Sequence, residues 1–185
     1  MSVGPTIRPY PTRYVGEWTM KDGTLIVIRP IRPVDEPLMV KFHSTLSEQS
    51  VYLRYFHMEK LDSRVAHERL IKKCFIDYDR EMALVADREN PHNGDHEILA
   101  VGRMTKLSES AEAEVAVLVS DESQKLGLGT ELLRRLIQVA HDEKLERLVA
   151  IILSENYGMM ALAKYFQFKI RESTDPTVVV AVLDV

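Results

Sequence analysis

The chain has 185 residues, of which 45% are hydrophobic, and this length favours one compact domain with a hydrophobic core. Its formal net charge is −4 and its basic residues are scattered among acidic ones, which argues against a nucleic-acid-binding surface. The single cysteine, Cys74, excludes an internal disulfide and a metal site built from several cysteines.

Residues 1–23 are expected to form a linker and a lead strand, and residues 24–185 the main domain. Residues 1–14 are rich in proline and lack the continuous apolar region of a signal peptide. The longest apolar runs, residues 148–153 and 178–183, are far shorter than the roughly 18 residues that a membrane-spanning helix needs. We therefore expect a soluble, cytoplasmic protein.

Two β-hairpins are predicted in the first two thirds of the chain. Residues 14–20 and 24–31 are strand-like runs that flank a Lys-Asp-Gly turn signal. Residues 81–87 and 98–104 flank a dense turn cluster at residues 89–95. Each pair of runs is expected to fold back on itself as antiparallel strands.

Helices are predicted between the two hairpins. Pro33 stands where a helix can begin, because its fixed φ suits the first helical turn. Ser47 is the predicted cap of a second helix, since its hydroxyl can accept a hydrogen bond from a free amide. Asp62 and Ser63 mark the predicted start of a third helix.

A strand, a loop, a helix and a second strand form the clearest unit of the chain. A strand over residues 112–119 leads into a glycine-rich loop at 124–129, and an amphipathic helix begins near Thr130. Residues 148–153 are continuously apolar, as expected of a central parallel strand reached by a helical crossover. A helix over residues 156–166 and a terminal strand over 178–183 are predicted to follow.

The glycine-rich loop has the chemistry of a diphosphate site. Gly127 and Gly129 expose backbone N–H groups at the positive end of a helix dipole, and coenzyme A carries a diphosphate. A dinucleotide-binding loop would have a glycine in place of Leu132, and a triphosphate loop would have a lysine before Thr130. Both of those motifs fail, and the remaining alternative is a glycine-rich helix start without a ligand.

The loop Gln124-Lys125-Leu126-Gly127-Leu128-Gly129, with Val119 five residues before it, resembles the acyl-CoA loop of the GNAT N-acetyltransferase superfamily. The predicted order of elements over residues 24–185 also resembles the GNAT fold. That α/β fold has a mixed central sheet flanked by helices, in which a splayed pair of parallel strands binds acyl-CoA. Residues 156–168 are similar to the second motif of the superfamily, although Gln167 stands where a glycine is usual. The resemblance implies an N-acetyltransferase that uses acetyl-CoA.

A closer resemblance is to bacterial protein lysine acetyltransferases, whose C-terminal GNAT domain follows a region homologous to ADP-forming acyl-CoA synthetases. The stretches that carry it are residues 7–11, 25–33, 46–56 and 113–117. It implies that the acceptor is a protein lysine, with an acyl-CoA synthetase as one class of partner, and that a synthetase-like region can precede this domain. No nucleic-acid or membrane partner is expected.

The resemblance also implies which residues bind acetyl-CoA. Backbone amides of the loop hold the pyrophosphate, and the preceding strand hydrogen-bonds the pantetheine arm as an added strand would. Lys125 adds positive charge near the phosphates or is simply solvated, and Asn156 contacts the pantetheine arm or only caps its helix. The implied binding residues are Val117, Leu118, Val119, Gln124, Lys125, Leu126, Gly127, Leu128, Gly129, Thr130 and Asn156.

Glu114 is the implied general base, because it matches the proposed base of the subfamily within residues 113–117. Strand alternation also puts Glu114 on one face with Ala116 and Leu118, so that its carboxylate lies beside apolar neighbours. The alternative interpretation is a solvated carboxylate at a strand end.

The general acid is not identified by the sequence. Ala163 occupies the position from which many GNAT enzymes supply a tyrosine, and Tyr165 should lie about 200° further round the same helix. The six histidines show no metal-ligand spacing, so no metal is expected. Four residues of a family-like stretch either shape an acceptor groove or only pack a helix, and they are Tyr52, Arg54, Tyr55 and Phe56.

The sequence is therefore compatible with three functions. The leading hypothesis is protein lysine acetylation by direct attack of the amine on the thioester. The second is acetylation of a small metabolite amine, which a deep acidic pocket beside Glu114 would favour. The third is an acyl-CoA-binding sensory module without turnover, which the missing tyrosine at Ala163 suggests.

Overall fold

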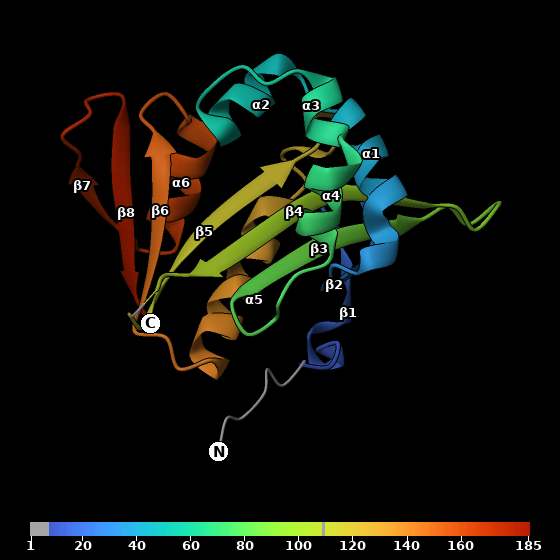
Figure 1. The fold of residues 1–185 in the computed structure, drawn as a ribbon, viewed down its shortest axis with the longest axis horizontal. Coiled ribbons are helices and arrows are strands. Elements are labelled where there is room, and N and C mark those ends of the chain that lie inside the picture. Colours follow the sequence, from blue (N-terminus) through green and yellow to red (C-terminus); the bar gives the residue numbers. More distant parts are fainter. Residues whose placement is uncertain (1–7, 109) are drawn as a thin grey trace.

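A computed structural model describes residues 8–108 and 110–185 of the chain. These residues form one eight-stranded sheet with the strand order β1-β2-β3-β4-β5-β6-β8-β7, flanked by helices (Figure 1). All neighbouring strands are antiparallel except β5 and β6, which are parallel. The sheet is therefore mixed, as predicted. The first seven residues of the expected linker lie outside the described residues.

The elements have the following bounds. The strands are β1 (Gly16–Thr19), β2 (Leu25–Pro30), β3 (Glu81–Glu89), β4 (His96–Lys106), β5 (Glu112–Val119), β6 (Arg147–Leu153), β7 (Lys169–Glu172) and β8 (Val178–Asp184). The helices are α1 (Glu36–Ser44), α2 (Glu48–Tyr55), α3 (Leu61–Val65), α4 (His67–Cys74), α5 (Leu128–Asp142) and α6 (Tyr157–Tyr165). In the described chain, no helix combines the length and the apolar character that crossing a membrane requires.

The sheet separates two hydrophobic clusters. In Figure 1, α5 passes behind the sheet and α4 lies in front of it. Behind the sheet, Leu132, Leu133 and Leu136 of α5 are 0% exposed, and burial of each side chain contributes about 2 kcal/mol. On the opposite face, Phe42 of α1 and Leu70 of α4 fill the second cluster. The two clusters hold the helices on opposite sides of β4 and β5.

Most predicted elements are confirmed. Both hairpins form, and Gly23 takes φ +88° in the tight turn between β1 and β2. Ser47 caps α2, because its hydroxyl oxygen accepts a hydrogen bond from the amide of Ser50 at 3.2 Å. The unit β5, α5 and β6 is present, with the two strands parallel.

Several boundaries differ from the predictions. The expected third helix is two helices, because the backbone of Ala66 leaves the helical region between α3 and α4. Asp62 lies inside α3 and is not its cap. The helix expected near Thr130 begins two residues earlier, at Leu128, because Gly127 supplies the left-handed turn before it. Strand β7 was not predicted.

Strands β5 and β6 pair at one end and separate at the other. Their register pairs join Glu112, Ala113 and Glu114 to residues 147–149, although β5 continues to Val119. Beyond Glu114, β5 stays paired with β4 and β6 stays paired with β8. The parallel pair is therefore splayed, as the GNAT-like arrangement predicted.

A buried ionic network fixes the start of the domain. Arg29 of β2 binds Asp35 through two hydrogen bonds of 2.7 and 2.8 Å, and its Nε donates to Asp87 at 3.0 Å. Asp87 also contacts Nδ1 of His96 at 2.8 Å. Burial acts to lower the pKa of Arg29, but the contacts with Asp35 and Asp87 outweigh burial and raise it. The guanidinium therefore stays charged and holds β2, β3 and the start of α1 together.

Candidate functional site

The glycine-rich loop presents a row of free backbone donors. Within the described residues, the amide hydrogens of Leu126 to Thr130 take part in no hydrogen bond, and the first amide that does is that of Glu131, which donates to the carbonyl of Gly127 at 3.0 Å. Lys125 and Gly127 both have positive φ, +63° and +92°. Left-handed residues of this kind turn successive N–H groups into one concavity. Together with the dipole of α5, the loop is suited to binding a diphosphate.

The two glycines of the loop have different roles. At Gly127, positive φ disfavours a side chain, and a Cβ atom would lie 3.1 Å from the ring of Trp18. At Gly129, a Cβ atom would meet Leu162 at 3.7 Å and Val117 at 3.9 Å, which is ordinary contact distance. The fold therefore requires glycine at position 127 and not at position 129. The missing side chain at Gly129 leaves its backbone open to close approach.

Polar contacts anchor the loop to β5, to α2 and to the turn between β1 and β2. Gln124 donates from Nε2 to the carbonyl of Val119 and to the hydroxyl of Ser50, both at 3.3 Å. The carbonyl of Leu126 accepts a hydrogen bond from the amide of Lys21 at 3.1 Å. The Gln124 side chain thus ties the loop to β5 and α2, and Gln124 and Lys125 are both exposed.

The strand residues named for the pantetheine arm lie in the splayed part of β5. Val117 and Val119 are half-buried on the α5 face, near Gly129, whereas Leu118 faces the cluster formed by α1 and α4. Asn156 caps α6, since its Oδ1 accepts a hydrogen bond from the amide of Met159 at 3.0 Å. The structure therefore confirms the cap, and among the described residues the side-chain nitrogen of Asn156 donates no hydrogen bond.

Glu114 sits at the fork of the two parallel strands. It is exposed and belongs to the last register pair before β5 and β6 separate. In the part of the chain that the structure describes, its carboxylate has no hydrogen-bond or ion-pair partner. Glu112, by contrast, forms an ion pair with Arg147. Glu114 is thus the free carboxylate at the fork.

Comparison with known proteins decides the family. The family model described as "Acetyltransferase (GNAT) domain" matches residues 26–169. The chain belongs to the GNAT acetyltransferase family. A Pseudomonas aeruginosa acetyltransferase is 28% identical to this GNAT chain over 144 residues, which cover 78% of this chain and 75% of that protein.

Solved structures show the same fold. The GNAT domain of S. lividans PAT is 26% identical, with a TM-score of 0.83, and the match covers 95% of this chain and 99% of that chain. Mycobacterium smegmatis RimJ, solved in complex with CoA-disulfide, has a TM-score of 0.69 at 14% identity and matches 92% of this chain and 87% of that chain. This GNAT protein is therefore an acyltransferase that uses acetyl-CoA.

In this GNAT enzyme, α6 places Tyr165 away from the direction of Ala163, as the sequence predicts. Ala163 is 0% exposed and faces the core, whereas Tyr165 is 71% exposed on the opposite side of the helix. Tyr165 therefore does not replace a tyrosine at position 163.

A small cavity that sequence reasoning missed lies on the same face of β5 as Glu114. It has a volume of about 40 Å³, and its floor includes Ala116 and Leu118 of β5. Its walls carry basic side chains from α2, α4 and β4, among them Arg54 and Arg103. Arg54 was named from the sequence as a candidate for the acceptor groove, but Arg103 carried no signal, because it lies within an ordinary strand pattern.

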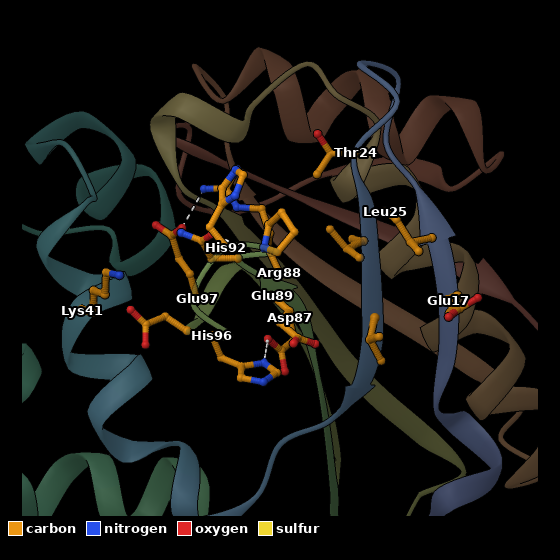
Figure 2. Close-up of a pocket in the computed structure, with 15 residues that line it drawn as sticks. Glu17, Thr24, Leu25, Lys41, Asp87, Arg88, Glu89, His92, His96 and Glu97 are labelled. Atoms are coloured by element: carbon orange, nitrogen blue, oxygen red, sulfur yellow. Dashed lines mark hydrogen bonds and ion pairs between the residues drawn. The ribbon is translucent and has the colours of Figure 1, made fainter.

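A larger cavity lies away from this site. It has a volume of about 800 Å³ and lies where the β3–β4 hairpin meets β1 and β2, with His96 turned toward Asp87 (Figure 2). None of the residues named for acetyl-CoA or for catalysis lines it. Its size therefore does not mark it as the acetyl-transfer site. Among the described residues, no group of three or more His, Cys, Asp or Glu side chains is arranged to hold a metal ion.

Proposed function

We propose that this GNAT enzyme transfers the acetyl group of acetyl-CoA to the side-chain amine of a protein lysine. The observation that carries the proposal is the exposed and unpaired carboxylate of Glu114 at the fork of β5 and β6. A lysine on the surface of another protein can reach an exposed strand face without a deep channel that would exclude the rest of that protein. The resemblance to bacterial protein lysine acetyltransferases within residues 113–117 supports the same acceptor class.

In this proposal, the donor lies on the α5 side of the fork. The free amides of Leu126 to Thr130 bind the pyrophosphate, and bare Gly129 lets it approach. The pantetheine arm runs along the splayed backbone of residues 117–119, and Asn156 contacts it from the start of α6. The thioester then reaches the fork beside Glu114.

Glu114 acts as the general base. Making a lysine amine neutral at pH 7 costs about 5 kcal/mol from its reference pKa of about 10.4. Glu114 accepts that proton directly or through a water molecule. The amine nitrogen attacks the thioester carbonyl, a C–N bond forms, the C–S bond breaks, and the nitrogen releases its extra proton to solvent. The coenzyme A thiolate leaves as an anion and takes its proton from solvent, since Ala163 supplies no acid.

The acceptor surface favours a protein over a small metabolite that carries amines and no carboxylate. A deep acidic pocket would be needed to gather such a metabolite, and the cavity beside Glu114 is basic instead. We further propose that the enzyme acts in the cytoplasm, that residues 24–185 form the catalytic domain and that residues 1–23 connect it. An acyl-CoA synthetase is the proposed class of acceptor protein.

The test is acetylation of a cytosolic extract with isotopically labelled acetyl-CoA, read by mass spectrometry. We expect label on protein lysines when active protein is added, and none with a heat-inactivated sample. Label confined to small-molecule amines would instead establish the metabolite enzyme. Tight acetyl-CoA binding without any labelled product would establish a sensory module.

A further inference from the structure

The small cavity beside Glu114, which we call the cationic cavity, gathers positive charge. Arg54 of α2, Arg69 and Lys73 of α4, and Arg103 of β4 line it together with the buried His43. Arg69 forms an ion pair with Glu59, and a carboxylate oxygen of Glu81 lies 3.5 Å from Arg103 Nη1. Four cationic side chains therefore face two carboxylates, and the cavity has an excess of positive charge.

Among the described residues, two buried polar atoms in the cavity have no hydrogen-bond partner. His43 is 4% exposed, and its Nδ1 forms no hydrogen bond with the described residues. Arg103 donates from Nη2 to the carbonyl of Lys73 at 2.6 Å, but its Nη1 lacks hydrogen-bond geometry toward Glu81. Buried polar groups are normally satisfied, so these two atoms can bind a ligand with oxygen acceptors that enters the cavity.

The protonation state of His43 is consistent with a cavity that donates hydrogen bonds to an anion. Burial, and then the positive charges of Arg64, Arg69 and Arg103, lower the pKa of His43 to about 4. The imidazole is therefore neutral at pH 7 and has one N–H to donate. The arginines are held in place, because Arg54 and Arg69 both stack on the ring of Tyr55 at 5.2 Å. An anion entering the cavity meets donors that are already oriented.

The cavity is close to the reaction. Ala116 and Leu118 line it, and both lie on the same face of β5 as Glu114. Residues two apart on a strand are separated by roughly 7 Å. An amine at Glu114 and an anion in the cationic cavity can therefore belong to one acceptor molecule. The volume of about 40 Å³ would hold roughly three water molecules, and a carboxylate has three heavy atoms.

We propose that the cationic cavity holds a carboxylate of the acceptor, so that the enzyme selects amines carrying a carboxylate roughly 7 Å away. This proposal rests on the proposed acetyl transfer at Glu114. The carboxylate comes from an acidic side chain beside the acceptor lysine, or from the acceptor itself if it is a free diamino acid. The two sources share one chemistry, and the experiment separates them.

The first experiment compares acetylation of matched lysine peptides in which neighbouring positions carry Glu or Gln. The parent protein is expected to show at least about a tenfold lower KM for the best Glu peptide, as one charge-assisted hydrogen bond provides. Lys73→Gln and Arg54→Gln are expected to reduce the difference in KM between the Glu and Gln peptides. The matched control is Lys72→Gln, which removes a charge from the next residue of α4, an exposed position that does not line the cavity.

Free diamino acids form the second arm of the same experiment. If a diamino acid is acetylated with a KM as low as that of the best Glu peptide, and Lys73→Gln raises this KM, the acceptor's own carboxylate occupies the cavity. If only the Glu peptides show the low KM, the occupant is an acidic side chain. Equal KM values for Glu and Gln peptides and no effect of Lys73→Gln would overturn the proposal.

A direct measurement keeps this proposal separate from the proposed function. Acetate is titrated into the full chain, and NMR follows the side-chain signals of His43 and Arg103. Saturable shifts that weaken in Lys73→Gln and persist in Lys72→Gln support the cavity, even if no amine is acetylated. With acetate binding and no acetylated amine, the proposed acetyl transfer would be refuted and the carboxylate site would stand. Shifts without saturation, or equal in both variants, would overturn the carboxylate site.

Discussion

Gly129→Ala should separate the stability of the fold from its ability to bind acetyl-CoA. The added methyl group would meet Leu162 at 3.7 Å, Val117 at 3.9 Å and Val119 at 4.0 Å, all ordinary contacts. Gly129 is the second residue of α5, and its φ is not in the left-handed region. Replacing a helical glycine by alanine stabilises a helix by up to about 1 kcal/mol. Thermal unfolding without ligand should therefore stay unchanged or rise by about 2–4 °C.

The affinity of Gly129→Ala for acetyl-CoA should fall, although its stability does not. The methyl group takes up space beside Val117 and Val119, where the proposed ligand lies, and so keeps a pyrophosphate from approaching the free amides. Loss of one hydrogen bond to a charged oxygen costs about 1.5–3 kcal/mol, which is at least about tenfold in Kd. We therefore expect a protein that is as stable as the parent or more so, and that binds acetyl-CoA at least about tenfold more weakly.

The assay is isothermal titration calorimetry with acetyl-CoA, paired with thermal unfolding of the free protein. The matched control is Gly158→Ala, since Gly158 is the exposed second residue of α6 and its added methyl group would meet Asn156 at 3.8 Å. An unchanged Kd in Gly129→Ala would refute the loop as a diphosphate site. A loss of stability greater than about 1 kcal/mol would refute the claim that the fold tolerates a side chain there.

Three further predictions concern single side chains. Glu114→Gln should lower kcat by about 10²–10⁴ with an unchanged Kd for acetyl-CoA, and thiol release that persists at the parent rate would contradict its role as base. The pKa of His43 falls from 6.5 to about 4 in the folded state, so the full contribution of His43 to the free energy of unfolding is present above pH 6.5. As pH falls from 6.5 to 4, that contribution of about 3 kcal/mol is lost, and urea unfolding of His43→Leu should show a correspondingly flatter pH dependence. Arg29→Ala should cost about 3–5 kcal/mol in urea unfolding because it removes the buried guanidinium that pairs with the carboxylates of Asp35 and Asp87, whereas exposed Arg134→Ala should cost less than about 1 kcal/mol.

The sequence was most informative where one local pattern determines one element. The apolar run over residues 148–153 and the face of Leu132, Leu133 and Leu136 predicted a strand and a helix that the structure confirms. The separation of β5 from β6 followed from the resemblance and not from periodicity, because no residue type marks the end of strand pairing. The family assignment depended on the loop at 124–129.

Other features depend on contacts that no local pattern reports. Strand β7 escaped prediction because all four of its residues are exposed, so it shows no alternation of buried and exposed side chains. The break at Ala66 lies in a stretch with helical periodicity on both sides, and neither glycine nor proline marks it. The cationic cavity joins His43, Arg54 and Arg103, which are distant in sequence and meet only through the packing of α1 and α2 on the sheet.

The short parallel pairing of β5 and β6 also bears on how the native protein opens. Three residue pairs connect strands β1–β5 to the C-terminal strands β6, β7 and β8, so that the C-terminal strands form a unit with few backbone bonds to the rest. Local opening of such a unit requires less free energy than global unfolding. A ligand lying across the fork raises the free energy of each opening that disrupts its site. Acetyl-CoA should therefore slow hydrogen exchange throughout β6 and β8, well beyond the residues that it touches, so that the donor acts as a removable structural brace.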